Sequence, residues 1–133
     1  MTRTAHFDLR LDGASGVPVY RQLIDQVLTA MASGKLTAGD QLPTVRQVAV
    51  DLAINPNTVM RAYRELEIRG ILTTQQGTGT FITEKKVKAG EAQRRRRLSQ
   101  MAGELVARAG AEGFSVDELL EVLRDLQDEH KRR

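Results

Sequence analysis

Apolar residues recur every three or four positions in several stretches of this chain, a spacing that predicts amphipathic helices. The first such stretch opens at Pro18, and its apolar face consists of Val19, Leu23, Ile24, Val27, Leu28 and Met31. Just before it, apolar and polar residues alternate, which predicts a short strand over His6–Leu11 followed by a loop. The front of the chain is therefore expected to contribute one strand and one helix.

Two shorter helices are predicted in the middle of the chain, with a tight turn between them. Thr44 and Gln47 have the spacing of a capping box, and the helix that they begin runs to about Leu52. Asn55 can cap the next helix through its side-chain oxygen, and Pro56 suits the first helical position, where its missing N–H is not needed. Two short helices joined in this way form a helix-turn-helix.

The pattern then changes to one that is typical of a β-hairpin. Gly70 is placed to end the second of these helices, and two β-prone runs follow at Ile71–Gln75 and Thr80–Glu84. The segment between them, Gln76-Gly77-Thr78-Gly79, has the glycines that a hairpin tip needs. A helix-turn-helix followed by a hairpin over residues 71–83 predicts a winged helix.

The helix over residues 56–69 has an apolar face and a polar, basic one. Val59, Ala62, Tyr63 and Leu66 fall on the first, and the second presents Asn57, Thr58, Arg61 and Arg64. Asn and Arg side chains can pair with base edges, Thr can bond a phosphate, and a helix N-terminus favours phosphate. Any solvated amphipathic helix shows the same division, so the interpretation as a recognition helix depends on the motifs around it.

The order and spacing of these motifs resemble the winged-helix domain of the GntR family of bacterial transcription regulators, over roughly residues 18–83. The resemblance rests on Leu42-Pro43-Thr44-Val45-Arg46-Gln47-Val48-Ala49, Asn57-Thr58-Val59-Met60-Arg61-Ala62-Tyr63, Leu66-Glu67 with Gly70, and Gly77-Thr78-Gly79-Thr80-Phe81. It implies DNA contacts by Arg46, Asn57, Thr58, Arg61, Gln76, Gly77, Thr78 and Gly79, with the wing tip in the minor groove. Several subfamilies have an arginine where this chain has Pro56, so its preferred base sequence cannot be taken from them.

The 133-residue chain leaves too little after the hairpin for the large ligand-binding or aminotransferase-like domains of most GntR-type regulators. The arrangement instead resembles the YtrA subfamily, in which a short helical tail joins two chains. The sequence supports a helical tail independently, because apolar residues recur at helical spacing from Leu98 to Ala109. Gly110 and Gly113 are then expected to end this first tail helix. Ser115 and Glu118 then form the capping box of a second tail helix.

Helices as short as these two tail helices are marginal alone in water, so the apolar face of each one needs another surface to pack against. These apolar faces can pack on the winged helix of the same chain or on the tail of a second chain, and we expect the second chain. The residues expected at this dimer interface are Leu98, Met101, Leu105, Val106, Phe114, Leu119, Leu120, Leu123 and Leu126.

The formal net charge is only +3, but basic residues are concentrated between the hairpin and the tail. This basic run comprises Lys85, Lys86, Lys88, Arg94, Arg95, Arg96 and Arg97. If the run lies over a duplex it neutralises phosphates, and otherwise it is a solvated linker; both interpretations stay open. The expected domains are a DNA-binding head over 1–84, a basic linker and helix start over 85–97, and a dimerisation tail over 98–133.

Composition argues against several other classes of protein. The chain has no cysteine, which excludes disulfides and cysteine zinc sites and suits a reducing cytoplasm. It has no apolar run long enough to cross a bilayer and no export leader. His6 and His130 lack partners at metal-ligand spacing, and the glycines of the hairpin tip lack the following helix of a phosphate-binding loop. We therefore expect a cytoplasmic protein with no enzyme activity, catalytic residue, cofactor, metal or membrane.

Together these features predict a mainly helical fold with a small β-hairpin, in which a winged helix-turn-helix domain precedes a two-helix tail. The expected function is that of a homodimeric repressor that binds a palindromic operator through recognition helix 56–69 and wing 71–83. The alternative is a winged-helix module for protein assembly; the polar face of helix 56–69 argues against it, but Met60 nearby leaves some room for it. A small-molecule effector, if there is one, would have to bind at the dimer interface or between head and tail.

Overall fold

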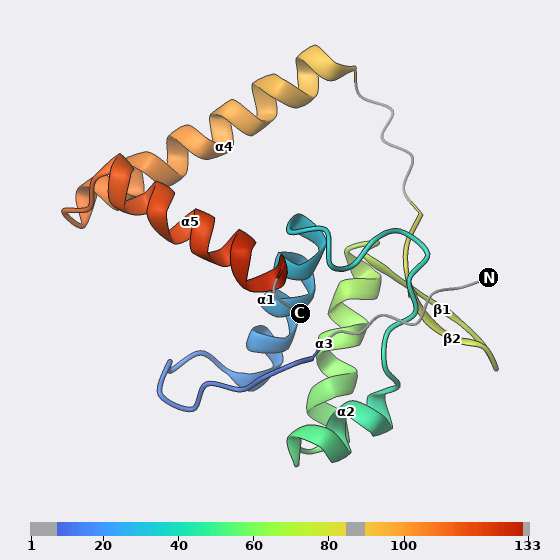
Figure 1. Cartoon of the computed structure of the whole chain (residues 1–133). Coiled ribbons are helices and arrows are strands. Elements are labelled where there is room, and N and C mark those ends of the chain that lie inside the picture. Colours follow the sequence, from blue (N-terminus) through green and yellow to red (C-terminus); the bar gives the residue numbers. More distant parts are fainter. Residues whose placement is uncertain (1–7, 85–89, 132–133) are drawn as a thin grey trace. The chain divides into compact units, whose positions relative to one another are not determined.

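The computed structural model describes residues 8–84 and 90–131, and it divides into two compact units between Lys85 and Lys86. The first unit contains α1 (Val19–Ala32), α2 (Val45–Leu52), α3 (Pro56–Ile68), β1 (Leu72–Gln75) and β2 (Gly79–Ile82). The second contains α4 (Glu91–Ala111) and α5 (Val116–Lys131) (Figure 1). The described residues form a mainly helical protein with a two-stranded antiparallel hairpin, so the predicted fold class is confirmed.

The core of the first unit lies where the apolar faces of α1, α2 and α3 meet. Burial of one such side chain contributes about 1.5–3 kcal/mol, which holds together helices that would be marginal alone. The hairpin closes one side of this core through Leu72 and Ile82, which are both buried. The buried helical residues are Leu23, Ile24, Val27 and Ala30 of α1, Val48 and Ala49 of α2, and Val59, Ala62, Tyr63 and Leu66 of α3.

The residues that the sequence indicated as caps do begin α2 and α3. Thr44 Oγ1 accepts a hydrogen bond from the backbone N–H of Gln47 at 3.0 Å, and Asn55 Oδ1 accepts one from the N–H of Asn57 at 2.8 Å. Between the two helices Ala53 has a φ of 55°, in the left-handed region. This conformation turns the chain sharply enough for α3 to begin at once, which confirms the helix-turn-helix.

The strand predicted over His6–Leu11 is wrong for residues 8–11, and its first two residues lie outside the described ones. Leu9 and Leu11 do pack against the core. However, the backbone N–H of Arg10 donates to Gln26 Oε1 at 2.8 Å, and Gln26 Nε2 donates to the Arg10 carbonyl. A side-chain amide on α1 thus takes the place of a neighbouring strand.

The second unit consists of α4 and α5, which are joined by a turn and contact each other near it. Ser115 Oγ accepts from the N–H of Glu118 at 3.1 Å, and the Ser115 N–H donates to Glu118 Oε1 at 3.2 Å, so this capping box is confirmed. α4 does not end at Gly110 but continues to Ala111. A glycine inside a helix costs only about 1 kcal/mol, and it is Gly113, with a φ of 88°, that turns the chain.

Candidate nucleic-acid interface

The outer face of α3 carries the residues that were predicted to read DNA. Asn57, Arg61 and Arg64 are exposed, and Thr58 is half-buried. Met60 lies among them with 53% of its surface exposed, although it was not among the predicted site residues. Met60 is therefore an exposed apolar side chain on an otherwise polar and basic face.

Tyr63 anchors α3 to the start of α2. Its hydroxyl donates to the carbonyl oxygen of Pro43 at 2.7 Å, while its ring is buried in the core. Burial raises the pKa of Tyr63 above its ordinary value, because the phenolate would be poorly solvated there. The hydroxyl therefore stays protonated and remains a donor well above neutral pH.

Arg61 is held by a residue of another helix. Its guanidinium lies over the ring of Tyr20 on α1, 3.8 Å from the ring centroid. By contrast, Arg69 at the end of α3 pairs with the carboxylate of Glu65 at 3.4 Å. Arg61 thus rests on a neutral aromatic ring, whereas Arg69 is paired with a negatively charged side chain.

Arg46 is the second residue of α2 and is exposed. The capped start of α2 fixes its backbone, since Thr44 immediately precedes the helix. Within residues 8–84, neither Arg46 nor Arg64 forms an ion pair with an acidic side chain. Both guanidinium groups therefore keep their positive charge available to an anionic partner.

The hairpin has the glycine-dependent tip that the sequence predicted. The N–H of Thr78 donates to the Gln75 carbonyl at 2.9 Å, and Gly77 has a φ of 79°. Gln76, Gly77 and Thr78 are exposed, whereas Gly79 is half-buried and begins β2. A Cβ at Gly79 would lie 2.5 Å from Gln41 Nε2, so the Gln41 side chain would have to move, and the φ of 140° at Gly79 is itself strained for any residue with a Cβ.

The segment before α2 supports the hairpin, a contact that the sequence analysis missed. Gln41 forms an antiparallel bridge with Phe81, and its side-chain Nε2 donates to the Thr78 carbonyl at 3.2 Å. The N–H of Leu42 donates to the carbonyl of Thr80 at 2.8 Å. No alternation marks this short segment as a strand in the sequence. The segment Gln41–Leu42 thus connects the wing to the start of α2, where Arg46 lies.

The hairpin is also attached to α3. Thr74 Oγ1 on β1 donates to Glu67 Oε1 near the end of α3. Together with the bridge at Gln41, this bond makes α2, α3 and the wing parts of one unit. The structure thus brings the predicted DNA-contacting residues of the head onto a single body.

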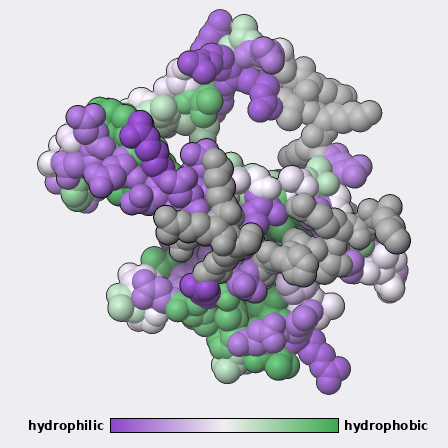
Figure 2. All heavy atoms as spheres, in the orientation of Figure 1, coloured by the Kyte–Doolittle hydropathy of each residue, from purple (hydrophilic) through white to green (hydrophobic). Residues whose placement is uncertain are grey.

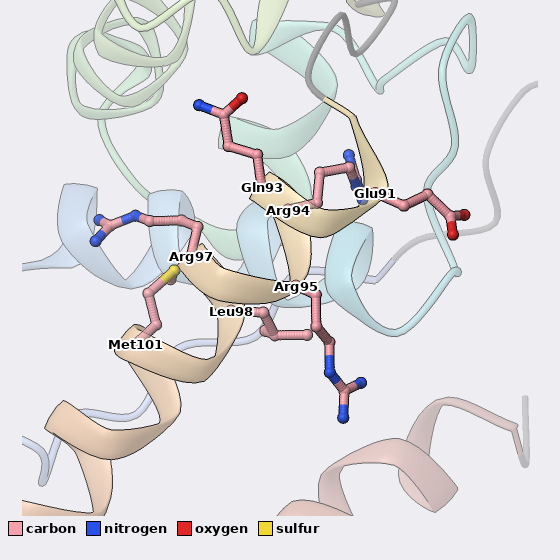
Figure 3. Close-up of a pocket in the computed structure, with 7 residues that line it drawn as sticks. All are labelled: Glu91, Gln93, Arg94, Arg95, Arg97, Leu98 and Met101. Carbon is pink, nitrogen blue, oxygen red and sulfur yellow. The ribbon is translucent and has the colours of Figure 1, made fainter.

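The arginines of the basic run lie in the first two turns of α4, while Lys85, Lys86 and Lys88 lie outside the described residues. Figure 3 shows Arg94, Arg95 and Arg97 fanning out from this helix, with Leu98 and Met101 following. Arg97 donates to Gln100 Oε1 at 3.2 Å, and in the described tail no arginine of the run pairs with an acidic side chain. Arg94 and Arg97 are three residues apart, so their like charges slightly oppose helix formation.

The residues predicted at a dimer interface lie on α4, on α5 and in the turn between them, and most of them are uncovered in the single chain. Figure 2 shows hydrophilic residues over the N-terminal part of α4 and hydrophobic ones farther along the tail. Leu119 alone of the predicted set is half-buried. The exposed members are Leu98, Met101, Leu105, Val106, Phe114, Leu120, Leu123 and Leu126.

The described residues contain no group of three or more His, Asp or Glu side chains that could hold a metal ion. In that same part of the chain, no helix is both long and apolar enough to cross a membrane.

Comparison with known proteins places this geometry in a family. Residues 19–82 match the family described as bacterial regulatory proteins, gntR family. The chain is 32% identical over 123 residues to the HTH-type transcriptional repressor YtrA of Bacillus subtilis (strain 168), a match that covers 92% of this chain and 95% of that protein.

Two solved structures are similar as well. One is a GntR family transcriptional regulator from Listeria monocytogenes, with 30% identity, a TM-score of 0.60, and coverage of 86% of this chain and 98% of that one. The other is YtrA from Sulfolobus acidocaldarius, a GntR-family transcription factor, with 28% identity, a TM-score of 0.56, and coverage of 74% and 97%. With its winged helix, its helical tail and these relatives, the chain belongs to the gntR family of bacterial regulatory proteins.

Proposed function

We propose that this protein is a homodimeric repressor of transcription that binds a specific DNA site through its head, residues 1–84. The observation that carries the proposal is the outer face of α3, where Asn57, Arg61 and Arg64 are exposed opposite a buried core. These side chains have the donors and acceptors that base edges and phosphates require. Regulation by DNA binding also agrees with membership of the gntR family.

In this proposal α3 enters the major groove and the wing tip, Gln76–Gly79, enters the adjacent minor groove. Asn57, Arg61 and Arg64 are assigned to base edges or nearby phosphates, together with Thr58 at the N-terminal turn, where a helix favours phosphate. Arg46 contacts the duplex from α2. The bonds that join the wing to α2 and α3 support simultaneous contact, because they hold these parts in one body.

The tail, residues 98–133, is assigned to dimerisation. Its exposed leucines include Leu105, Leu120 and Leu123, each with more than 40% of its surface uncovered. Pairing with a second tail would remove this apolar surface from water. Two linked heads make the second DNA contact intramolecular and raise affinity, and two-fold symmetry favours a palindromic operator. An effector, if there is one, would bind at the dimer interface or between head and tail and act by changing the separation of the heads.

The arginines of the basic run, Arg94–Arg97, are assigned to phosphate contact. Helix stability does not account for them, since like charges three residues apart repel and cations gain nothing near the start of a helix. Contacts of this kind would strengthen binding to all DNA sequences without adding discrimination.

The test is a mobility-shift titration of the full chain with the promoter fragment upstream of its own gene, at two salt concentrations and with excess random DNA. We expect a retarded band that survives the competitor. We expect Arg46→Ala or Arg61→Ala to weaken specific binding by about 1–3 kcal/mol. The matched control is Arg69→Ala, which removes the same charge from an arginine that is paired with Glu65. Unchanged affinity in both test variants contradicts the contact assignment.

A second function, protein assembly through the winged helix, is favoured by one observation. Met60 and Ile68 on α3 and Val50 on α2 are exposed, with Ile68 at 78%. Apolar surface of this kind suits contact with another protein. A chain that retards neither the promoter fragment nor random DNA, at either salt concentration, would favour this alternative over DNA binding.

A further inference from the structure

The contact between Arg61 and Tyr20 joins the recognition helix to the helix behind it. α1 and α3 pack side by side (Figure 1), and the guanidinium of Arg61 lies 3.8 Å from the centroid of the Tyr20 ring. Arg61 is exposed, whereas Tyr20 is half-buried and packs against the core. The ring is therefore a fixed support, and the arginine is the part that solvent or a ligand can reach.

An aromatic ring positions an arginine without neutralising it. A carboxylate partner would cancel the positive charge and place a negative charge close to the DNA phosphates. Here the acidic side chain one turn farther along α3, Glu65, pairs with Arg69 instead. The ring attracts the guanidinium through its quadrupole and covers one flat face, while the N–H donors lie in the guanidinium plane and remain free at its edge.

Such a support lowers the entropic cost of binding. A long arginine side chain that becomes fixed at an interface loses rotamer freedom, which weakens the complex. An arginine that already rests on a ring loses less, and its donors point in a defined direction before the DNA arrives. A bidentate contact depends on that direction, because the two N–H groups must meet two acceptors at once.

We propose that Tyr20 is a positioning residue for DNA recognition, whose ring orients Arg61 for contact with the duplex. The inference rests on the proposed function and adds to it a residue that lies outside the recognition helix. Tyr20 acts through Arg61, so its effect on DNA binding depends on the presence of that arginine.

The experiment is a double-mutant cycle on the full chain. The probe is the duplex that the wild-type chain selects from a random-sequence pool, titrated alongside random DNA. The variants are Tyr20→Leu, Tyr20→Phe, Arg61→Ala, and Tyr20→Leu combined with Arg61→Ala. Thermal unfolding of each variant shows whether it is folded.

Tyr20→Leu is expected to weaken binding to the selected duplex about two- to fivefold, the range of a cation–π contact at an exposed site. Tyr20→Phe keeps the ring and is expected to bind as the wild type does. In the Arg61→Ala background, Tyr20→Leu is expected to cause no further loss. A purely structural role of Tyr20 would give the same loss in both backgrounds, and that result overturns the inference.

Two further outcomes are decisive. If Tyr20→Leu does not fold, Tyr20→Met replaces it, since methionine keeps apolar bulk against the core but lacks the ring. Wild-type affinity in Tyr20→Met, or a loss of the same size in the Arg61→Ala background, would overturn the inference, and a loss that needs Arg61 would support it. A wild-type chain that selects no duplex from the pool overturns the proposed function and the inference with it.

Discussion

The hydrogen bond from Tyr63 to Pro43 allows a quantitative test of how α3 is held in place. In Tyr63→Phe the ring still fills its buried position, but the hydroxyl that donates to the Pro43 carbonyl at 2.7 Å is lost. Such a bond contributes about 0.5–1.5 kcal/mol, and an acceptor left without a partner costs about 1–3 kcal/mol when it is fully buried. Pro43 is only half-buried, so water can reach part of it. We therefore expect the variant to be less stable by about 1–2 kcal/mol at pH 7.

The difference between wild type and variant should shrink in alkali. Burial raises the pKa of Tyr63 in the folded state above the ordinary value of about 10 that it has in the unfolded chain. Below pH 10 the residue is protonated in both states, and its contribution to stability is complete. As the pH rises above 10, the unfolded state loses the proton first, which favours unfolding by about 1.4 kcal/mol per pH unit. At pH 11 the advantage of the wild type over Tyr63→Phe should thus be nearly gone.

The assay is urea unfolding followed by circular dichroism at pH 7 and pH 11, with the protein concentration held constant. Tyr20→Phe is the matched control, because among the described residues the Tyr20 hydroxyl makes no hydrogen bond, and its stability should equal that of the wild type at pH 7. Equal stability of Tyr63→Phe and wild type at pH 7 would refute the argument from the hydrogen bond. An unchanged difference at pH 11 would refute the argument from burial.

Three further predictions concern the turn, the tail and the basic run. Ala53 has a φ of 55°, a conformation that costs a residue with a Cβ about 1–2 kcal/mol. Glycine avoids this cost but is more flexible in the unfolded chain, so Ala53→Gly should stabilise the protein by a net of about 0.5–1 kcal/mol. The midpoint of urea unfolding measures this change, and a lower midpoint in the variant would contradict it. Leu120→Asp together with Leu123→Asp should give monomers in analytical ultracentrifugation, and retained dimers would place the interface elsewhere. Replacing Arg94–Arg97 by glutamine should lower the slope of log affinity against log salt by about 0.9 for each lost phosphate contact, while an unchanged slope would show that the run does not contact DNA.

Much of the head could be predicted from the sequence because its signals are local. Thr44 and Asn55 cap helices through bonds to residues two or three positions away, so the starts of α2 and α3 can be recognised without knowledge of the fold. The buried faces of the helices follow from a spacing of three and four residues in the same way. The outer face of α3 follows from its buried face, and with it the predicted positions of Asn57, Arg61 and Arg64.

Other features depend on residues that are distant in the sequence. The backbone of Arg10 is paired by the amide of Gln26, Gln41 contacts the hairpin tip through the carbonyl of Thr78, and Tyr20 lies under Arg61. The two residues of each pair are far apart in the sequence, so neither helical periodicity nor a capping motif could predict that they meet.

The sequence by itself therefore determined the order of the helices, the turn between α2 and α3, and the polar side of α3, because capping and periodicity act over a few neighbouring residues. Only the tertiary structure decided what supports the wing and what holds Arg61. Those contacts form when α1, α3 and the segment before α2 come together, since folding brings side chains within reach of each other however many residues separate them.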